Sequence, residues 1–514
     1  MNRVMQLVRR VALPLLLVCP MLTGLPQTAR AERVTEQEAR RVAENYIRFV
    51  VRQDGGWDRH ATARVISIEP FRRGDRVLGY FCPVEPVGYF VIALDRELAP
   101  IRCYSTRSNL DPNAEGGMTD LLKGRLERLY AAIGRTLGHA PSAAEDFGAV
   151  LPVSFRATWQ TLADPAFAPE RYVEERGSRS VGMDYQEGET LLLTTWSQEP
   201  PYNDDCPDHG CTWGGYGFYN TNAYVGCVAT AGAQVMKYWN WPPTGEGGIY
   251  ADPYDWPNMT GTYIHYSDTL FVNGQGDLVT YAQIRAVAEI SHEIGVAVDM
   301  DYGCDASGSL TSDMEGVYEN HYRYSPDCES AWWATYEEQW QMLTTEISLN
   351  RPVQYRIPEH SIVGDGWKDE WIGDPYRWIH VVYGWNGGND GWWPPLEIPG
   401  GDFWDEYIVC QIYPNCSLGD DISGLHGGGE YGYVYFDRDV HSQNGAIMPG
   451  TKAQVLRSGF LLENTGTLYA LWIMGQTTNG ETRVFMNGDE AGDTRIRVYD
   501  GAVKVDTGGQ LVLN

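Results

Sequence analysis

VGCVATAGAQVMKYWNWP, residues Val225–Pro242, places a cysteine at the start of a helical pattern. Apolar or small residues recur after Cys227 at the spacing of one helix face, and Pro242 ends the run. We therefore predict a helix over residues 227–239 with Cys227 at or near its N-terminus. The unpaired N–H groups and aligned dipoles there favour a thiolate over a thiol by about 0.3 to 2 kcal/mol. Most cysteines are nevertheless buried small hydrophobes or half of a disulfide, so the rest of the chain must decide the role of Cys227.

The charge balance and the N-terminal segment limit the classes of function. The 514 residues include 39 basic and 68 acidic ones, a formal net charge of −29, which repels nucleic acid and anionic membranes. Residues 1–31 have the pattern of a secretory signal, with basic residues, an apolar run and a small-x-small ending at Ala29–Ala31. No later segment is apolar enough to span a bilayer. We predict an exported protein of about two to four domains, with no nucleic-acid partner and no stable membrane insertion.

Ten cysteines in an exported chain favour disulfides. Cys19 leaves with the signal peptide, so nine remain and at least one is unpaired. Pairing the others with their nearest neighbours in sequence leaves Cys227 free, which favours a reactive thiol. The pairs predicted in this way are Cys82–Cys103, Cys206–Cys211, Cys304–Cys328 and Cys410–Cys416.

The periodicity of the sequence divides the chain into five parts. After the signal, a charged amphipathic helix, alternating runs such as RVLGYFCPV and a second helix over 116–139 predict a small α+β unit. A segment of weak periodicity follows, and then a main domain with helices near 227–239, 279–294 and 334–349 and a strand-rich part from 352 to 440. The last region alternates with a period of two, which predicts strands. The predicted boundaries are 1–31 for the signal peptide, 32–139 for the N-terminal unit, 140–185 for a linker, 186–445 for the main domain and 446–514 for a C-terminal β-rich region.

A cysteine nucleophile needs a base, most often a histidine that is distant in sequence. Two histidines lie in the strand-rich part, His360 in RIPEHSIVGDGW and His380 in YRWIHVVYGWNGG. His360 opens an apolar strand pattern that runs to a Gly-Asp-Gly turn, so its ring can lie at a sheet edge that faces a helix. We therefore select His360 as the candidate base. The histidines with ordinary loop or helix positions are His139, His209, His292 and His321.

Seven motifs occur in a fixed order along the chain. Five lie in the central region: GCVATAGAQVMKYWNWP, AVDMDYG, LNRPVQY, HSIVGDG and GWNGG…DGWW. Two precede them: GYFVIALDRELAPIRCYSTRSNLD and WSQEPPYN. Together they resemble the streptopain family of secreted cysteine peptidases, and the resemblance covers roughly residues 34–440.

The resemblance implies a papain-like α+β fold, with a helical part that carries the cysteine and an antiparallel β part that carries the histidine. It implies an exported zymogen whose residues 32–139 form an inhibitory propeptide and whose residues 140–185 contain the activation region. Carried over by position, Cys227 is the nucleophile, His360 the general base and His380 a structural histidine. The implied activity is broad hydrolysis of protein and peptide substrates without a cofactor. Candidate cleavage sites in the linker lie beside Arg171, Arg176 and Arg179.

The chain departs from the family pattern near the two histidines. Val382 and Tyr383 stand where the family has Asn-Trp, while Trp385 is kept. If that Asn helps to orient the base, Val382 cannot replace its side chain, although backbone groups could. Pro358 and Glu359 replace glycines before the histidine, so we expect a reshaped substrate pocket. A side-chain oxyanion donor is unassigned, and the weak candidates are Asn222 and Gln234.

Two other functions are compatible with these features. A papain-like acyl transferase or cross-linking enzyme uses the same thiol–imidazole pair, and a catalytically inactive exported adhesin would keep the fold without the reaction. A zinc site is not predicted, because Cys206, Cys211 and His209 lack a second pair of ligands. The acidic stretch at residues 299–305 is a weak calcium candidate, with solvated surface charge as the more ordinary interpretation.

Overall fold

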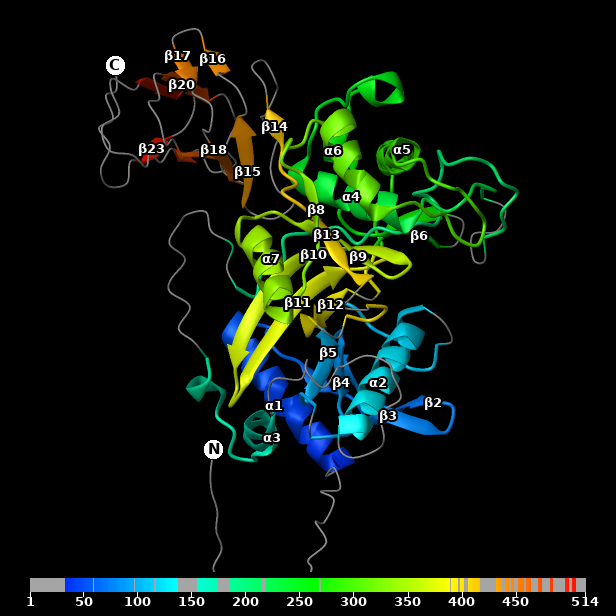
Figure 1. The fold of residues 1–514 in the computed structure, drawn as a ribbon, viewed down its shortest axis with the longest axis vertical. Coiled ribbons are helices and arrows are strands. Elements are labelled where there is room, and N and C mark those ends of the chain that lie inside the picture. The colour runs from blue at the N-terminus through cyan, green and yellow to red at the C-terminus, as the bar shows by residue number, and fades with distance from the viewer. Residues whose placement is uncertain are drawn as a thin grey trace, which may run out of the picture.

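Figure 1 shows the fold of the chain in a computed structural model. The structure describes residues 33–136, 155–173 and 185–416, apart from short gaps at 59, 97, 115–116, 186, 214–218, 268–269, 389, 396–397 and 402–404. Beyond residue 416 it describes strands between residues 431 and 504. The predicted signal peptide, 1–31, lies outside the described residues. Among the described helices, none combines the length and the apolar character that a membrane span requires.

One antiparallel sheet runs through both the N-terminal unit and the main domain. Its 11 strands have the order β1-β3-β4-β5-β12-β11-β10-β9-β13-β8, with β2 paired to β3. The two halves meet where Tyr104 of β5 pairs with Trp392 of β12, and Figure 1 shows the blue strands continuing from the yellow ones. The strands are β1 Arg64–Val65, β2 Glu69–Arg73, β3 Arg76–Glu85, β4 Tyr89–Ile92, β5 Ile101–Ser105, β8 Glu329–Ala331, β9 Val353–Ile357, β10 His360–Trp371, β11 Pro375–Val382, β12 Gly391–Trp393 and β13 Tyr407–Cys410, and a separate hairpin consists of β6 Ile264–Ser267 and β7 Leu270–Asn273.

The helices begin where the sequence provides caps or an apolar face. Thr35 accepts the N–H of Glu38 at the start of α1, and Thr280 forms a capping box with Gln283 at the start of α5. α4 is buried along almost its whole length, because it packs between β10 and α5. The three helices predicted for the main domain are confirmed, whereas α6 was not predicted. The helices are α1 Glu36–Asp54, α2 Gly117–Thr136, α3 Arg156–Ala163, α4 Cys227–Trp239, α5 Tyr281–Ala297, α6 Met314–Tyr322 and α7 Tyr336–Ser348.

A buried polar cluster joins the N-terminal unit to the main domain. The ammonium group of Lys368 on β10 contacts the hydroxyl of Tyr104 on β5 and lies 2.9 Å from the carboxylate of Glu370. The hydroxyl of Tyr46 on α1 donates to the same carboxylate at 2.7 Å. Buried charges require partners of this kind. Apolar side chains of α1 pack around the cluster against Trp378 of β11, so the two parts share one hydrophobic core.

Part of the segment predicted to be a linker, 140–185, is folded. α3 lies within it and packs against α1. The indole N–H of Trp159 donates to the carbonyl of Leu98 at 2.8 Å, and the amide N–H of Thr158 donates to the carboxylate of Asp374 at 2.9 Å. These contacts hold α3 on both the N-terminal unit and the β10–β11 hairpin. Sequence reasoning missed α3 because eight residues show little more than two helical turns.

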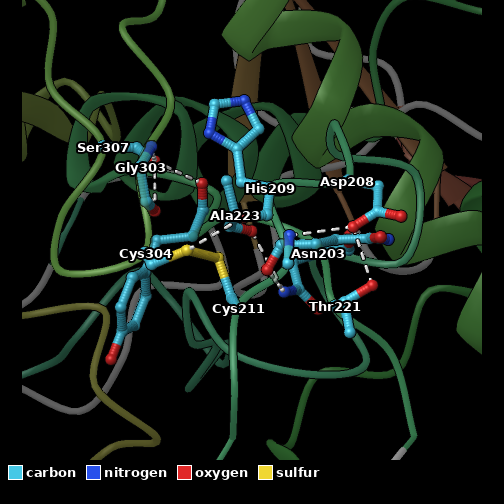
Figure 2. The surroundings of a disulfide bond; sticks show 12 residues. Asn203, Asp208, His209, Cys211, Thr221, Ala223, Gly303, Cys304 and Ser307 are labelled. Atoms are coloured by element: carbon cyan, nitrogen blue, oxygen red, sulfur yellow. Dashed lines mark hydrogen bonds between the residues drawn. A yellow bond between two sulfur atoms is a disulfide. The ribbon is translucent and has the colours of Figure 1, made fainter.

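The described part of the chain has one disulfide, Cys211–Cys304, shown in Figure 2. It joins the loop before α4 to the loop after α5. The predicted pairs Cys206–Cys211 and Cys304–Cys328 are therefore wrong. The Cys206 and Cys328 thiols are buried in the core that the helices form, so neither is available to the loops that carry the disulfide.

The predicted pair Cys82–Cys103 is also wrong, because the two thiols lie on opposite faces of the sheet. Cys82 is opposite Phe90 of β4, whereas Cys103 is opposite the next residue, Val91. Successive residues of a strand point to opposite faces. Each thiol is accordingly buried in a different hydrophobic core.

The last predicted pair, Cys410–Cys416, is not formed either. Cys410 is a free, buried thiol, and its Sγ donates to the carbonyl of Glu329 at 3.6 Å. Cys227 is free, as predicted, and it is partly exposed. It is thus the one free cysteine of the described residues that is not fully buried.

The C-terminal part is rich in strands, as predicted. β14, β15, β18 and β19 form a four-stranded sheet, and β16–β17, β20–β22 and β21–β23 form two-stranded pairs. The domain boundary at residue 446 stays a prediction. The strands are β14 Asn415–Cys416, β15 Tyr431–Phe436, β16 Val440–Ser442, β17 Gly445–Ile447, β18 Lys452–Leu456, β19 Gly459–Glu463, β20 Ala470–Ile473, β21 Glu481–Arg483, β22 Arg495–Val498 and β23 Ala502–Lys504.

Candidate active site

The helix that carries Cys227 begins where the sequence predicts. Cys227 is the first residue of α4, and Gly226 before it has a φ of 92°. A Cβ atom at Gly226 would lie 2.6 Å from the sulfur of Met300 and 3.1 Å from the carbonyl oxygen of Ser307. Only glycine fits both this approach and this positive φ. Gly226 therefore lets the chain turn into α4 directly against the loop that the disulfide holds.

Backbone N–H groups face the Cys227 thiol. Burial raises the pKa of the thiol, while the N–H groups of Ser361, Val228 and Cys227 itself oppose this shift. The N–H groups of Cys227 and Val228 belong to the first turn of α4, where they have no acceptor within the helix. Ser361 follows His360 on β10, so this contact brings the start of the helix to the start of the strand. The thiol is protonated at neutral pH, and a base must accept its proton before it can act as a nucleophile.

Gln354 on β9 fixes the two elements relative to each other. Its side-chain N–H₂ group donates to the carbonyl of Val228 on α4 and to the hydroxyl of Ser361 on β10, both at 3.0 Å. Its oxygen accepts from the hydroxyl of Tyr318 at 2.9 Å. The side chain is fully buried, so these bonds replace those it would make with water. Sequence reasoning did not select Gln354, although a polar residue inside the apolar pattern of a strand was the available signal.

His360 is the first residue of β10, after a two-residue turn at Pro358 and Glu359. Its Nε2 atom lies 2.9 Å from the carbonyl oxygen of Tyr383. Because a carbonyl only accepts, Nε2 carries the hydrogen and Nδ1 is the proton-accepting nitrogen of the neutral ring. Trp385 stacks on the imidazole with ring centroids 4.5 Å apart. Burial lowers the pKa of His360 to about 4, against the effect of the bond to Tyr383, so the ring is neutral at neutral pH.

The departure from the family pattern at Val382 and Tyr383 is accommodated by the backbone. Both side chains are buried, and the Tyr383 hydroxyl donates to the carbonyl of Pro399 at 3.0 Å. An apolar side chain at Val382 cannot accept a hydrogen bond, and the main-chain carbonyl of Tyr383 supplies the acceptor for His360 instead. The sequence left open that backbone groups could take this place, but it did not identify which.

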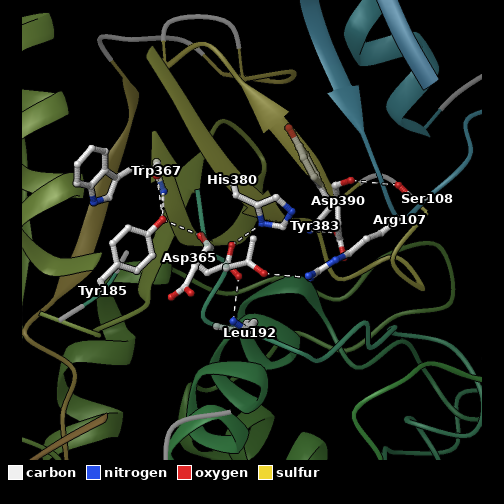
Figure 3. A network of polar contacts seen from close by, with 11 residues as sticks. Arg107, Ser108, Tyr185, Leu192, Asp365, Trp367, His380, Tyr383 and Asp390 are labelled. Atoms are coloured by element: carbon white, nitrogen blue, oxygen red, sulfur yellow. Dashed lines mark hydrogen bonds and ion pairs between the residues drawn. The ribbon is translucent and has the colours of Figure 1, made fainter. Parts of the chain in front are cut away.

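His380 belongs to a separate polar pair, shown in Figure 3. Its Nδ1 lies 2.6 Å from Oδ1 of Asp365, whose other oxygen accepts the N–H of Leu192 at 3.0 Å. His380 and Asp365 are both buried. The Gly-Asp-Gly turn predicted around Asp365 is wrong, because β10 continues through it with a register shift between Gly364 and Gly366. A bulge of this kind re-aims a side chain without ending the strand.

The two weak candidates for an oxyanion donor have other partners. The Asn222 amide donates to two carbonyls of the preceding loop at 3.0 and 2.8 Å, and the oxygen of Gln234 accepts the N–H of Trp196 at 3.1 Å. Gln198, which sequence reasoning did not select, lies on a segment beside the start of α4. Its carbonyl accepts the N–H of Val225, two residues before the candidate nucleophile, at 3.0 Å.

The residues considered for zinc do not form a metal site. Cys211 is bonded to Cys304 and is therefore not available as a thiolate ligand. Over the described residues, no group of three or more His, Cys, Asp or Glu side chains is arranged to hold a metal ion.

Residues 196–393 match the sequence profile described as the Peptidase C10 family. The matched range contains Cys227, Gln354, His360 and His380. These residues belong to the Peptidase C10 family. The C10 region is the domain of a cysteine peptidase, and protein substrates follow from that class. Its α+β, papain-like fold class is confirmed, with Cys227 in the helical part and His360 in the antiparallel β part.

Two curated proteins are similar to the chain. Streptopain of Streptococcus pyogenes is 24% identical over 356 residues, which cover 64% of this chain and 77% of streptopain. The thiol protease/hemagglutinin PrtT of Porphyromonas gingivalis is 27% identical over 183 residues, which cover 33% of this chain and 20% of that protein. The resemblance to the streptopain family is thereby confirmed, and it extends beyond the C10 region.

Two solved structures from Prevotella intermedia are also similar. A fragment of prointerpain A is 21% identical with a TM-score of 0.47, and the comparison covers 68% of this chain and 99% of the fragment. The interpain A cysteine protease is 28% identical with a TM-score of 0.35, and the comparison covers 44% of this chain and 94% of that protein.

Proposed function

We propose that the chain is the precursor of an exported cysteine endopeptidase in which Cys227 is the nucleophile and His360 the general base. The arrangement of these two side chains carries the proposal. The thiol lies at the N-terminus of α4 and faces the N–H of Ser361, the neighbour of His360. The bond from Nε2 to the carbonyl of Tyr383 leaves Nδ1 to take the proton of the thiol.

The reaction starts from a neutral pair, because burial raises the pKa of Cys227 and lowers that of His360. As Sγ attacks the carbonyl carbon of the peptide, its proton moves to Nδ1. The imidazolium then protonates the leaving amine, which departs and leaves a thioester. A water molecule gives a proton to the same nitrogen and hydrolyses the thioester, which restores the thiol and the neutral ring. Trp385 covers one face of the imidazole and limits its access to water.

The oxyanion requires hydrogen-bond donors at the start of α4. The N–H of Cys227 lies in the first turn of the helix and supplies one donor. Gln198 supplies a side-chain donor in this proposal, because its backbone is bonded to Val225 and its side chain is only partly buried. A Gln198→Ala variant should lower kcat by about 10²-fold or more, the usual loss for a single oxyanion donor.

The N-terminal unit acts as an inhibitory propeptide in this proposal. The continuous sheet and the buried cluster of Tyr46, Tyr104, Lys368 and Glu370 support a stable association with the C10 region. Arg171 ends a short 3₁₀ helix, Pro169–Arg171, which makes its backbone a poor protease substrate. Arg176 and Arg179 lie outside the described residues and stay candidate cleavage sites.

Hydrolysis of casein by the wild-type chain and the Cys227→Ser variant tests the proposed reaction. We expect the variant to lose hydrolysis and to keep its melting temperature, because the substitution removes little packing. His360→Ala should be nearly as damaging, and the two losses should not add, since the pair acts as a unit. Comparable hydrolysis by the Cys227→Ser variant would show that another residue is the nucleophile. Ligated products in place of net hydrolysis would indicate an acyl transferase.

Incubation of the full-length precursor tests the zymogen. The wild type should show a lag, then a shortened form and activity that rises with that form. Added mature enzyme should shorten the lag, and the Cys227→Ser precursor should stay full length unless that enzyme is supplied. Full activity of the uncut precursor from time zero would refute an inhibitory role for residues 32–139.

A further inference from the structure

We propose that Asp390 is a positioning residue for His360 and acts through the backbone of Tyr383. The inference rests on the proposed function, because it assigns a role in the same reaction. Asp390 ends the return loop between β11 and β12, and it lies 30 residues beyond His360 in sequence. Figure 3 shows its side chain directed at Tyr383, next to the pair of His380 and Asp365.

Two hydrogen bonds connect Asp390 to the imidazole through one residue. The N–H of Tyr383 donates to Oδ1 of Asp390 at 2.9 Å. The carbonyl of the same residue accepts from Nε2 of His360, also at 2.9 Å. Asp390 and Tyr383 are both buried, so water does not replace either bond at low cost. The position of the Tyr383 carbonyl thus depends on the carboxylate that holds its N–H.

The middle of the loop between β11 and β12 packs against the helical part, and Asp390 connects the two ends of the loop. Gly384 has a φ of 72°, and a Cβ atom there would lie 3.0 Å from Cγ2 of Thr230 on α4. The N–H of Asn386 donates to the carbonyl of Trp196 at 3.2 Å. These contacts hold the middle of the loop against the helix that starts at Cys227. The bond between Asp390 and Tyr383 holds the first part of the loop, where the Tyr383 carbonyl contacts the imidazole of His360.

In this chain the loop backbone supplies the hydrogen-bond acceptor for His360, which a polar side chain could otherwise supply. Val382 has no polar atom, so the acceptor for His360 is a main-chain carbonyl. A carbonyl cannot be re-aimed by a rotamer change, and its direction is set by how its residue is held. In an enzyme of this type, a misplacement of about 1 Å can cost about 10²-fold in rate. We therefore expect the loss of Asp390 to act on turnover and not on substrate affinity.

The charges around Asp390 determine how the test must be designed. Burial raises the pKa of Asp390 to about 7, while the N–H of Tyr383, His380 and Arg107 oppose the shift and Asp365 adds to it. Oδ1 can accept the N–H whether or not the carboxyl group is ionised. An asparagine has the same shape and an acceptor oxygen in the same place. Asp390→Asn therefore separates the hydrogen bond from the charge.

The test compares Asp390→Ala, Asp390→Asn and wild type, each expressed as the full chain and activated with tagged wild-type enzyme that is then removed. Asp390→Ala should lower kcat about tenfold to a hundredfold and leave KM within about twofold. Asp390→Asn should stay within about fivefold of wild type. Glu346→Ala is the matched control, because the Glu346 carboxylate also accepts a backbone N–H, that of Gln411 at 2.8 Å, on a part of α7 outside the His360 contacts. It should lower the melting temperature and leave kcat unchanged.

The rate at which iodoacetamide alkylates Cys227, measured over a range of pH, gives a second readout. A purely structural role of Asp390 would leave this pH profile unchanged. Wild type should be alkylated near neutral pH at a rate that depends on His360, because the neutral imidazole accepts the proton of the thiol as the sulfur reacts. Asp390→Ala should lose most of this rate near neutral pH, and its alkylation should instead follow the ionisation of the thiol at higher pH. Asp390→Asn and Glu346→Ala should keep the wild-type profile.

Each outcome decides the inference. If Asp390→Ala matches wild type in kcat and in the alkylation profile, or if Asp390→Asn is as impaired as Asp390→Ala, positioning through the Tyr383 N–H is refuted. If Asp390→Ala does not fold, Asp390→Glu replaces it, since the extra methylene displaces the acceptor and should reproduce the loss. An unchanged Asp390→Glu enzyme would then refute the inference. If wild type shows no hydrolysis that depends on Cys227, the proposed function fails first, and the inference fails with it.

Discussion

The neutral state of His360 makes the stability of the folded chain depend on pH, and replacing the residue should remove that dependence. Burial lowers the pKa of His360 from 6.5 to about 4. Between these two values the unfolded chain binds a proton that the folded chain does not. The contribution of this residue to stability is therefore complete above about pH 6.5, is lost as the pH falls to about 4, and is constant below that. The perturbation is His360→Gln in the Cys227→Ser background, which prevents self-cleavage.

The magnitude follows from the size of the pKa shift. A difference of one pKa unit corresponds to about 1.36 kcal/mol, so a shift from 6.5 to about 4 corresponds to at most about 3 kcal/mol. The side chain is partly exposed, and solvent screening reduces the effect. We therefore expect the free energy of unfolding of the parent to fall by about 1 to 3 kcal/mol more than that of the His360→Gln variant between pH 7 and pH 4.5.

Urea unfolding at several pH values, followed by tryptophan fluorescence, measures the difference between the two chains. Other buried groups titrate in both chains, so their effects cancel in the comparison. His209→Gln, at an exposed loop residue, controls for the loss of any histidine. Parallel pH profiles for the parent and His360→Gln would refute the neutral imidazole. A parent that becomes more stable as the pH falls, relative to the variant, would show that the folded state holds an imidazolium.

Three further results are expected. Mass mapping of the non-reduced chain should find Cys211–Cys304 bridged and Cys227 free; a bridge to Cys227 in the active enzyme would contradict the proposed mechanism. Replacing both bridged cysteines by alanine should lower the free energy of unfolding by about 2 to 5 kcal/mol, measured by urea unfolding, because the bond closes a long loop. Tyr46→Phe removes the donor to buried Glu370 and should lower the free energy of unfolding of the Cys227→Ser precursor by about 1.5 to 3 kcal/mol. In the wild-type precursor the same substitution should shorten the lag before activity appears. An unchanged lag would show that this hydrogen bond does not contribute to inhibition.

The sequence was sufficient for elements with a strong local signal. The helix at 227–239 and the strand that opens with His360 are both defined by apolar periodicity and by their ends. The family motifs then connected Cys227 to His360 across more than a hundred residues, which periodicity alone cannot do. The roles of these two residues stay a prediction until a variant is assayed.

The errors arose where the result depended on which face of an element a side chain occupies. Cys82 and Cys103 are close in sequence, but adjacent register positions direct them into different cores. Pairing cysteines by their distance in sequence does not take into account which face of the sheet each one occupies. The Gly-Asp-Gly segment is similar, since the glycines suggested a turn, whereas the structure uses them for a bulge that directs Asp365 at His380.

Residues that act through hydrogen bonds at a distance were also missed. Gln354 and Asp390 touch the site through backbone groups of other elements, and their partners are fixed only in the folded chain. Asp390 lies between Gly-Gly-Asn and Gly, so the sequence alone favours a turn residue. Nothing in the local pattern indicates that its carboxylate holds Tyr383.

The sheet that runs from β5 into β12 changes what a cut in the connecting segment can achieve. Before the cut, a tether holds the N-terminal unit beside the C10 region at an effective concentration that can reach the millimolar range. Cleavage removes the tether but none of the strand pairing, and the unit then stays bound according to its own dissociation constant. The fraction of C10 regions that still bind the N-terminal unit then depends on the total protein concentration. On the proposed division of the chain, a fully cleaved sample should therefore gain specific activity when it is diluted, although no further bond is broken.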